Sequence, residues 1–181
     1  MKKLFILLTI LVSCVVAQAQ WSVGLDARIA PWNTDNRNYG TDIVVNYQLN
    51  AGGLFVLPSA GLFYKCLKEE DMYLGLNGPS PHTYSKNGYQ TGFDVGIFIG
   101  KEFSLGPGAL GIFTGPRYGY AFISDVCDPV NRNSLDWRIG VSYRIWKITA
   151  SVKCDIGCLK YASYYNHRQV STLAIGVAYN L

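Results

Sequence analysis

Few residues of this chain have the type and spacing that catalysis requires. The two histidines, His82 and His167, would each need a nearby serine and an acid to act as the base of a hydrolase or acyltransferase. Ser80, Ser85 and Ser163 are only loosely near them in the sequence. A role as ordinary residues of surface loops is the plainer interpretation of both histidines, and a lipid-modifying enzyme stays as an alternative.

The cysteines and one glycine motif give no stronger indication of chemistry. Cys154 and Cys158 are four residues apart on one face of a predicted strand, roughly 13 Å at the usual strand rise, too far for a disulfide or a shared metal. Cys66 and Cys127 belong to two long connections at the same end, so a disulfide between them stays open. The segment 106–111 matches a dinucleotide fingerprint by letter, but it lies in a predicted hairpin turn. We expect no metal and no cofactor.

Composition narrows the class of protein. The chain has 181 residues, of which 49% are hydrophobic, 14% aromatic and only 15% charged. This length suits one domain, and so few charges are unusual for a cytosolic enzyme or a disordered chain. The formal net charge of +4 falls to about +2 without Lys2 and Lys3, which argues against nucleic-acid binding.

The N-terminal segment has the features of a secretory signal peptide. Two lysines precede an apolar stretch from Leu4 to Val12, and Ala17-Gln18-Ala19 forms a small-x-small cleavage site. We therefore divide the chain into a signal peptide, 1–19, and a mature domain, 20–181. Cys14 also fits a lipoprotein signal, which would make it a lipidated N-terminus.

The mature chain alternates between apolar and polar residues with the period of a β-strand. In the segment from Trp21 to Ile29 every odd residue is apolar and every even residue is Gly or polar. Pro58 and Pro116 interrupt two strands, where we expect a bulge or imperfect pairing. The eight predicted strands span 21–29, 40–49, 54–66, 89–103, 109–123, 135–146, 148–158 and 170–181.

The connections alternate between long and short. Tight turns are predicted at 50–53, 104–108 and around Lys147, and longer polar connections at 31–39, 67–88, 124–134 and 162–168. This order is typical of an antiparallel up-and-down meander with its short turns at one end.

The residues on the two faces indicate which one meets lipid. The apolar face carries large side chains at nearly every position, whereas the polar face is rich in Gly, Ser, Thr and Asn with few charges. A soluble barrel would instead place Lys and Glu outside. Aromatic residues gather near both predicted ends, as in interfacial girdles: Trp21, Phe103, Trp146 and Tyr179 near the short turns, and Tyr64, Tyr120 and Trp137 towards the other end. The sequence thus predicts an all-β fold, an eight-stranded antiparallel up-and-down transmembrane β-barrel. A secreted soluble barrel or sandwich is the alternative.

This pattern resembles the eight-stranded OmpA/OmpX-like barrels, and more narrowly the Bacteroidota-type outer membrane protein β-barrel domain, or porin family. The resemblance covers the mature chain, from Ala-Gln-Ala-Gln20 through the segment 55–64 to the terminal 176–181. It implies export and residence in the outer membrane of a Gram-negative cell, with membrane lipid and the barrel-assembly machinery as partners. In such families a C-terminal aromatic marks the last strand; here Tyr179 fits and Leu181 replaces the usual Phe.

With the apolar face outward, twelve charged residues are predicted to face the lumen, six of each sign. Because eight strands leave an interior that side chains can fill, and because buried charges must be paired, we expect an internal charge network that plugs the barrel. A narrow ion path or a ligand pocket would use the same residues. The set is Asp26, Asp42, Asp94, Glu102, Asp136 and Asp155 against Arg28, Lys65, Arg117, Arg138, Arg144 and Lys153.

The sequence favours a small outer-membrane barrel that is not an enzyme and has a structural or loop-mediated interaction role. A narrow channel of the porin family and an outer-membrane lipid-modifying enzyme are the alternatives. The predicted loops mix aromatics with Asn, Ser and Gly, which suits adaptable contacts. They do not name an external ligand.

Overall fold

The computed structural model describes residues 19–29, 39–51, 53–73, 82–124, 132–158, 161–162, 167–168 and 171–181. Most of the predicted signal peptide, including Cys14, lies outside these residues, as do Cys127 and Ser163. Strand β1 begins at Ala19, the last residue of the predicted signal peptide. Among the described residues, no helix is long and apolar enough to cross a membrane.

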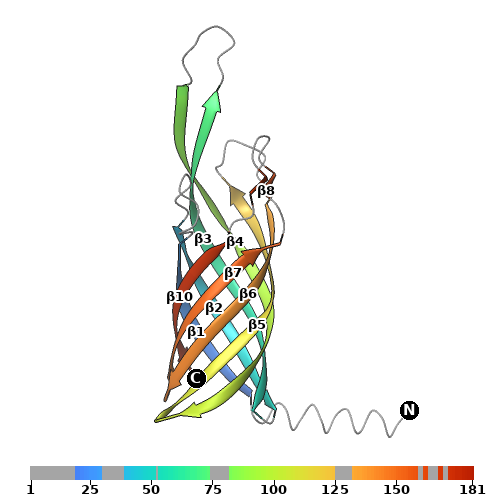
Figure 1. Ribbon diagram of the computed structural model, residues 1–181, viewed down its shortest axis with the longest axis vertical. Coiled ribbons are helices and arrows are strands. Elements are labelled where there is room, and N and C mark those ends of the chain that lie inside the picture. The colour runs from blue at the N-terminus through green and yellow to red at the C-terminus, as the bar shows by residue number, and fades with distance from the viewer. Residues whose placement is uncertain are drawn as a thin grey trace, which may run out of the picture.

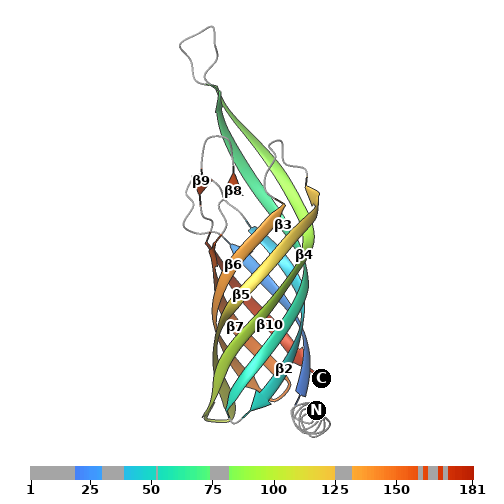
Figure 2. The ribbon, with the colours of Figure 1, turned by 90° about the vertical axis from the view of Figure 1, so that its right-hand side faces the viewer.

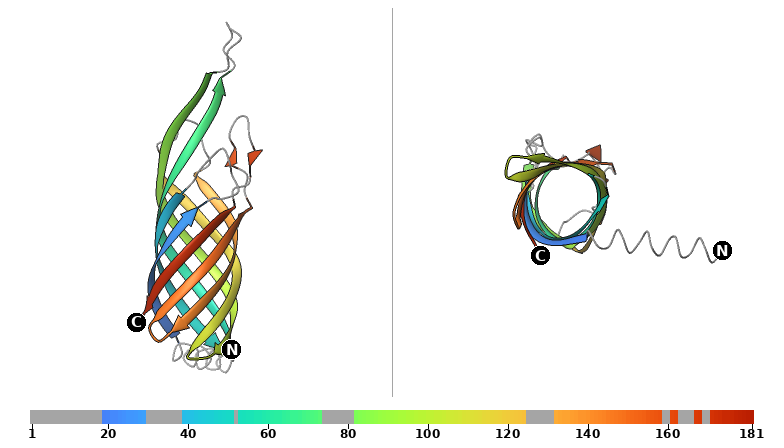
Figure 3. Two further views of the ribbon diagram at one scale, coloured as in Figure 1. Left: turned by 60° about the vertical axis from the view of Figure 1, so that its left-hand side comes forward. Right: turned by 90° about the horizontal axis from the view of Figure 1, so that it is seen from below.

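Eight strands of the described chain close into an all-antiparallel barrel (Figures 1 and 3). Each strand pairs with its neighbour in the chain, and the last strand returns to the first, so the predicted meander and fold class are confirmed. The order around the wall is β1-β10-β7-β6-β5-β4-β3-β2. The bounds are β1 Ala19–Ile29, β2 Tyr39–Ala51, β3 Leu54–Tyr73, β4 His82–Leu105, β5 Gly108–Ser124, β6 Asn133–Ile145, β7 Ile148–Gly157 and β10 Thr172–Asn180.

Two-residue turns join strands at the lower end in Figure 1. Leu105 pairs with Gly108 across the β4–β5 turn, and Ile145 pairs with Ile148 across the β6–β7 turn. Gly106 has a φ of 58°, a left-handed conformation that glycine adopts without steric cost. We call this the short-turn end and the opposite end the long-loop end.

The two prolines interrupt pairing without changing the register. Asn46 pairs with Ser59 and Leu49 with Val56, but the two positions between them, which include Pro58, are unpaired with β2. The β4–β5 ladder skips two positions around Pro116 in the same way. Imperfect pairing was predicted at both sites. A register shift occurs instead between Thr91 and Gly92, where the sequence carries no proline.

The prediction that residues 67–88 form a long polar connection is wrong for most of this range. Strands β3 and β4 remain paired as far as Tyr73 and His82, beyond the rim where Cys66 pairs with Tyr39 of β2. The result is a two-stranded ribbon, in which 67–73 pair with 82–88, that rises well above the barrel (Figures 1 and 2). Its sequence is mostly polar and lacks the alternation that identified the other strands.

Two further short strands lie at or within the predicted connection 162–168. β8, Tyr161–Ala162, pairs with β9, His167–Arg168, in a small separate sheet. Both histidines that were expected in loops therefore belong to strands, His82 to β4 and His167 to β9. Cys66, which the sequence placed at the end of the predicted strand 54–66 and beside the long connection after it, is within β3.

Candidate functional site

The lumen contains a buried group of ion pairs that we call the arginine–aspartate cluster. Its centre is Arg117 on β5, whose side chain is 1% exposed. Arg117 Nε and Nη2 donate to the two carboxylate oxygens of Asp94 on β4 at 3.1 and 2.6 Å, a bidentate pair. Nη1 lies 3.4 Å from Asp136 and 3.7 Å from Asp155, and Nη2 lies 3.6 Å from Asp42. The cluster consists of Arg28, Arg117, Arg138, Asp42, Asp94, Asp136 and Asp155.

Asp155 on β7 connects the other two arginines of the cluster. Arg138 Nε and Nη2 donate to its two oxygens at 2.6 and 2.9 Å. Arg28 Nη1, from β1 on the other side of β10, donates to Oδ2 of the same carboxylate at 3.0 Å. Arg28 also forms an ion pair with Asp42. The cluster thus connects six of the eight strands through side chains almost entirely hidden from solvent.

Two further ion pairs lie outside the arginine–aspartate cluster. Lys153 Nζ donates to both oxygens of Asp26 at 2.7 and 2.6 Å, and both residues are buried. Arg144 Nη2 donates to Glu102 at 2.9 Å near the short-turn end, and its Nη1 donates to Gln20 at 2.5 Å. The Arg144 and Glu102 side chains are 23% and 22% exposed.

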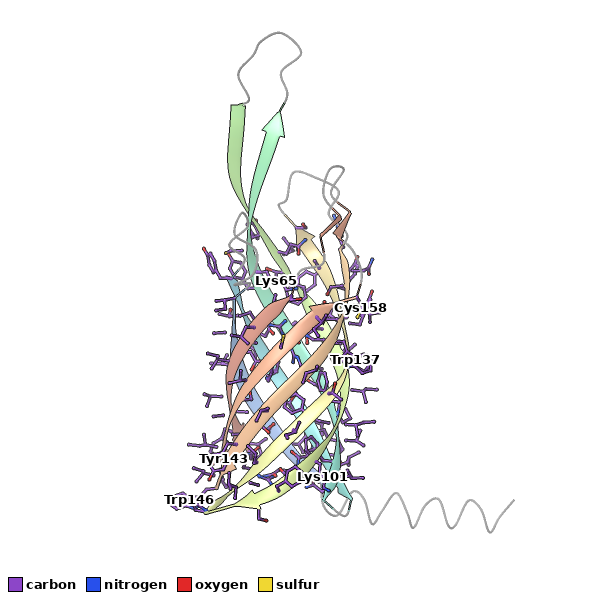
Figure 4. The ribbon with its side chains drawn as sticks, in the orientation of Figure 1. Lys65, Lys101, Trp137, Tyr143, Trp146 and Cys158 are labelled. Carbon is purple, nitrogen blue, oxygen red and sulfur yellow. The ribbon has the colours of Figure 1, made fainter. Side chains whose placement is uncertain are left out.

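Lys65 is the one predicted lumen charge that the structure does not bring into an ion pair with a described carboxylate. Its ammonium instead lies 4.4 Å from the centroid of the Phe63 ring. Figure 4 places Lys65 at the long-loop end of the barrel. The structure therefore brings eleven of the twelve predicted residues into three groups and leaves Lys65 beside an aromatic ring.

The sequence interpretation missed four phenylalanines that face the lumen. Phe55, Phe63, Phe98 and Phe113 are each at most 4% exposed. The Phe98 and Phe113 ring centroids are 5.8 Å apart, and the Arg138 guanidinium lies 5.4 Å from the Phe98 centroid. The sequence feature that could have identified them is an inward glycine on the neighbouring strand. Three of them lie directly opposite such a glycine: Phe55 opposite Gly100, Phe63 opposite Gly92 and Phe113 opposite Gly140.

A small cavity of about 60 Å³ lies on the short-turn side of the arginine–aspartate cluster. It is lined by the Asp26–Lys153 pair and by three of the phenylalanines, together with polar residues of β1, β2 and β10: Phe55, Phe98, Phe113, Ser22, Asn46, Gln48 and Asn180. This volume has room for a few water molecules and is too small for a drug-sized ligand. Among the described residues, no group of three His, Cys, Asp or Glu is placed to hold a metal ion.

The outer wall is apolar, the reverse of the lumen. Ile97 is 58% exposed, Ile175 59% and Leu25 63%, and the wall-facing aromatics Trp21, Phe103, Tyr64 and Trp137 are 44–52% exposed. Trp137 Nε1 donates to Thr114 Oγ1 at 2.8 Å, so this outward indole has a partner on the wall itself. Figure 4 shows Tyr143 and Trp146 at the short-turn end and Cys158 towards the other.

The described cysteines, Cys66, Cys154 and Cys158, carry free thiols. Cys154 and Cys158 belong to the outward set of β7 and its end, as the alternation predicted. The Cys66–Cys127 disulfide involves a residue outside the described part of the chain.

Comparisons with known proteins give likeness at the level of the fold. No protein-family model matches the chain, and no curated protein matches it. The structure is similar to the N-terminal β-barrel domain of Pseudomonas aeruginosa OprF, with 13% identity and a TM-score of 0.46 over 91% of this chain and all of that one. It is also similar to Ail, the attachment invasion locus protein of Yersinia pestis, solved with the heparin analogue sucrose octasulfate. That match has 15% identity and a TM-score of 0.45 over 90% of this chain and 97% of that one. The likeness is one of fold, and the chain itself forms a closed eight-stranded antiparallel barrel.

Proposed function

We propose that this protein is a small outer-membrane barrel with a closed lumen, which acts as a structural element of the envelope or through its exposed end. The observation that carries the proposal is the inverted distribution of side chains. Arg117 is 1% exposed and fully ion-paired inside, while large apolar residues cover the outside. Such a surface is stable in lipid and would aggregate in water. Export as a secreted precursor and insertion by the barrel-assembly machinery belong to the same proposal.

Two layers support a closed lumen. The arginine–aspartate cluster crosses the interior, and the Phe55, Phe98 and Phe113 rings pack together beside it. Opening a path for an ion would separate charges that are each compensated by a partner, which is costly inside a low-dielectric wall. The cavity beyond the rings is too small to form such a path by itself.

The ribbon supports an interaction role at the long-loop end. Beyond Cys66 and Gln90 neither β2 nor β5 accompanies it, so both ribbon strands have an edge without a neighbour in the described barrel wall. Unpaired backbone groups on a strand edge can pair with an extended segment of another protein. Because outer-membrane barrels place short turns in the periplasm, the ribbon would face the outside of the cell.

The lumen is tested by single-channel recording of the purified protein in a planar bilayer. The wild-type barrel should give no unitary current in concentrated KCl. A Phe98→Ala, Arg138→Ser double variant removes one ring from one layer and, from the other, the guanidinium that lies 5.4 Å from that ring. It should conduct in brief openings. Ile97→Ala, an outward substitution on the same strand, serves as the matched control. Steady unitary currents from the wild type would favour the channel alternative instead.

The orientation is tested by inserting an epitope tag. A tag in the connection 74–81 should bind antibody on intact cells, whereas a tag in the turn at 106–107 should bind only after the outer membrane is permeabilised. The opposite result would place the ribbon in the periplasm and remove the proposed external role.

The enzyme alternative is tested by His82→Ala and His167→Ala variants. Lipid profiles of expressing cells should match the wild-type profile in both cases. A change in acyl chain or headgroup composition that either variant abolishes would establish an enzymatic activity.

A further inference from the structure

The ladder between β1 and β10, which we call the seam, is where the two ends of the barrel sheet meet. Its register runs from Ser22 opposite Asn180 to Ile29 opposite Leu173. On its other side, β10 pairs with β7 from Tyr179 opposite Ile148 to Thr172 opposite Asp155. The last strand of the sheet is thus held between β1 and β7 (Figure 3).

At the centre of the seam, the residues of β10 that face the lumen have small side chains. Gly176 lies opposite Asp26 on β1 and Ser151 on β7, and Ala174 lies opposite Arg28 and Lys153. A Cβ added at Gly176 would overlap the Asp26 carboxylate, and Ala174 is completely buried. Small residues here leave room for side chains of β1 and β7 to meet above β10.

Two ion pairs cross β10 in this space, both along the same diagonal. Lys153 on β7 lies across Ala174 from Arg28, but it forms its ion pair with Asp26, two residues away on β1, at 2.6 Å. Asp155 forms its ion pair with Arg28 at 3.0 Å, again displaced by two residues along β1 and in the same direction. We call Asp26, Arg28, Lys153 and Asp155 the seam quartet.

The order of charges in the seam quartet distinguishes the native register from its neighbours. A slip of one residue would turn the apolar face of β1 into the lumen, so the competing registers are those displaced by two. If β1 moves so that Arg28 takes the position of Asp26, Arg28 meets Lys153. If β1 moves the other way, Asp26 takes the position of Arg28 and meets Asp155. Each slip therefore places like charges together in the lumen, where their repulsion is weakly screened.

We infer that the seam quartet sets the register in which the first strand of the barrel closes on the last. The backbone ladder alone has the same hydrogen-bonding capacity after a slip of two, and the outward residues on both strands remain apolar. The quartet supplies the difference in free energy that the backbone lacks.

Disulfide cross-linking measures this register directly. The native cysteines are first replaced by alanine, and Ala27→Cys is then combined with Ile175→Cys, Val177→Cys or Leu173→Cys. Ala27 lies opposite Ile175 in the native register, and all four positions lie on the outer side of the wall. Directly opposed residues are about 4.5–5.5 Å apart at Cα, within disulfide range, whereas positions displaced by two are too far apart. The unmodified lumen should give only the 27–175 cross-link.

Charge reversal at the Asp26–Lys153 pair should displace the register in opposite directions. These two residues are the better choice because, among the described residues, each forms an ion pair only with the other. Arg28 and Asp155 also form ion pairs with other members of the arginine–aspartate cluster. Lys153→Asp attracts Arg28 to its position, which should replace the 27–175 cross-link with 27–177. Asp26→Lys is attracted to Asp155, which should replace it with 27–173.

The charge-swapped double variant, Asp26→Lys with Lys153→Asp, should restore the 27–175 cross-link. Glu102→Lys is the matched control, because Arg144 and Glu102 also meet across one strand, β5, above Gly111 and Ala109, but away from the seam. It should leave the 27–175 cross-link unchanged.

Refolding into detergent micelles, with heat-modifiable gel mobility as the sign of a closed barrel, makes each result decisive. The inference is overturned if single reversals form closed barrels that keep the 27–175 cross-link. It is also overturned if the singles fail to close and the double variant fails equally. It is supported if each single reversal gives its displaced cross-link or fails to close, while the double variant closes with the 27–175 cross-link.

Discussion

Arg117 is the side chain on which the largest number of lumen carboxylates converge. It makes a bidentate pair with Asp94 and lies within 3.7 Å of three other aspartates. Planar guanidinium donors suit this geometry, because several N–H groups point in fixed directions towards separate carboxylates. Lysine could supply the charge but not the two parallel hydrogen bonds.

Replacing Arg117 with Met should destabilise the barrel by about 3–5 kcal/mol, because four carboxylates lose a shared buried cation. Arg117→Lys should cost less. Lys65→Met is the control, since Lys65 has no ion pair with a described carboxylate and should change stability by about 1 kcal/mol or less. The measurement is urea unfolding of barrels refolded in lipid vesicles. Equal losses for Arg117→Met and Lys65→Met would contradict the central role of Arg117.

Pairs of phenylalanine and glycine across neighbouring strands shape the inner wall. Phe113 on β5 lies opposite Gly140 on β6 and Gly100 on β4, so its ring can lie flat over backbone where a larger residue would stand. The ring covers a position that glycine would otherwise leave without a side-chain contact, an arrangement known to stabilise strand glycines. The strands are thus matched in volume as well as in hydrogen bonds.

Gly140→Ala should destabilise the barrel by about 1–3 kcal/mol, because the new Cβ overpacks this wall. Three atoms of the Phe113 ring would lie within 2.9 Å of it. Combining Gly140→Ala with Phe113→Leu should recover part of the loss, measured against Phe113→Leu alone by the same unfolding assay. Additive losses in the double variant would show that the ring and the glycine are not matched.

At the scale of the whole molecule, the barrel separates two environments with opposite requirements. Carboxylates and guanidinium groups are satisfied by one another inside, and the closed ladder pairs the backbone, so the outer wall presents mainly apolar side chains to the surroundings. The same arrangement makes the stability of the barrel sensitive to charge on its outer wall, and the sensitivity should depend on depth.

Ile97→Arg, at the middle of the part of β4 that pairs with β5, should destabilise the barrel in lipid vesicles by about 2–4 kcal/mol. Leu105→Arg, at the short-turn end of the same strand, should cost about 0–1 kcal/mol. Both side chains are exposed, at 58% and 54%, so burial in the protein does not distinguish them. Equal losses at the two positions would contradict a membrane centred on the middle of the barrel.

The sequence by itself determined the strand pattern, the inward and outward faces and most of the barrel topology. Alternation is a local property, and in Trp21 to Ile29 it can be read without knowing any neighbour. The inward position of eleven paired charges followed from that alternation alone. The ribbon escaped detection because residues 67–73 and 82–88 do not alternate between apolar and polar residues. Their pairing continues from the part of β3 and β4 that lies in the barrel wall.

Only the tertiary structure decided which charges meet. Lys153 and Asp26 are 127 residues apart, and their contact depends on the register of both ladders of β10 and on the small size of Gly176. Lys65 has the same inward position in the alternation but packs on Phe63 instead of joining an ion pair with a described residue. Alternation gives the face of a residue, whereas barrel closure and strand stagger give its height and its partners across the lumen, and these are not encoded in any local segment.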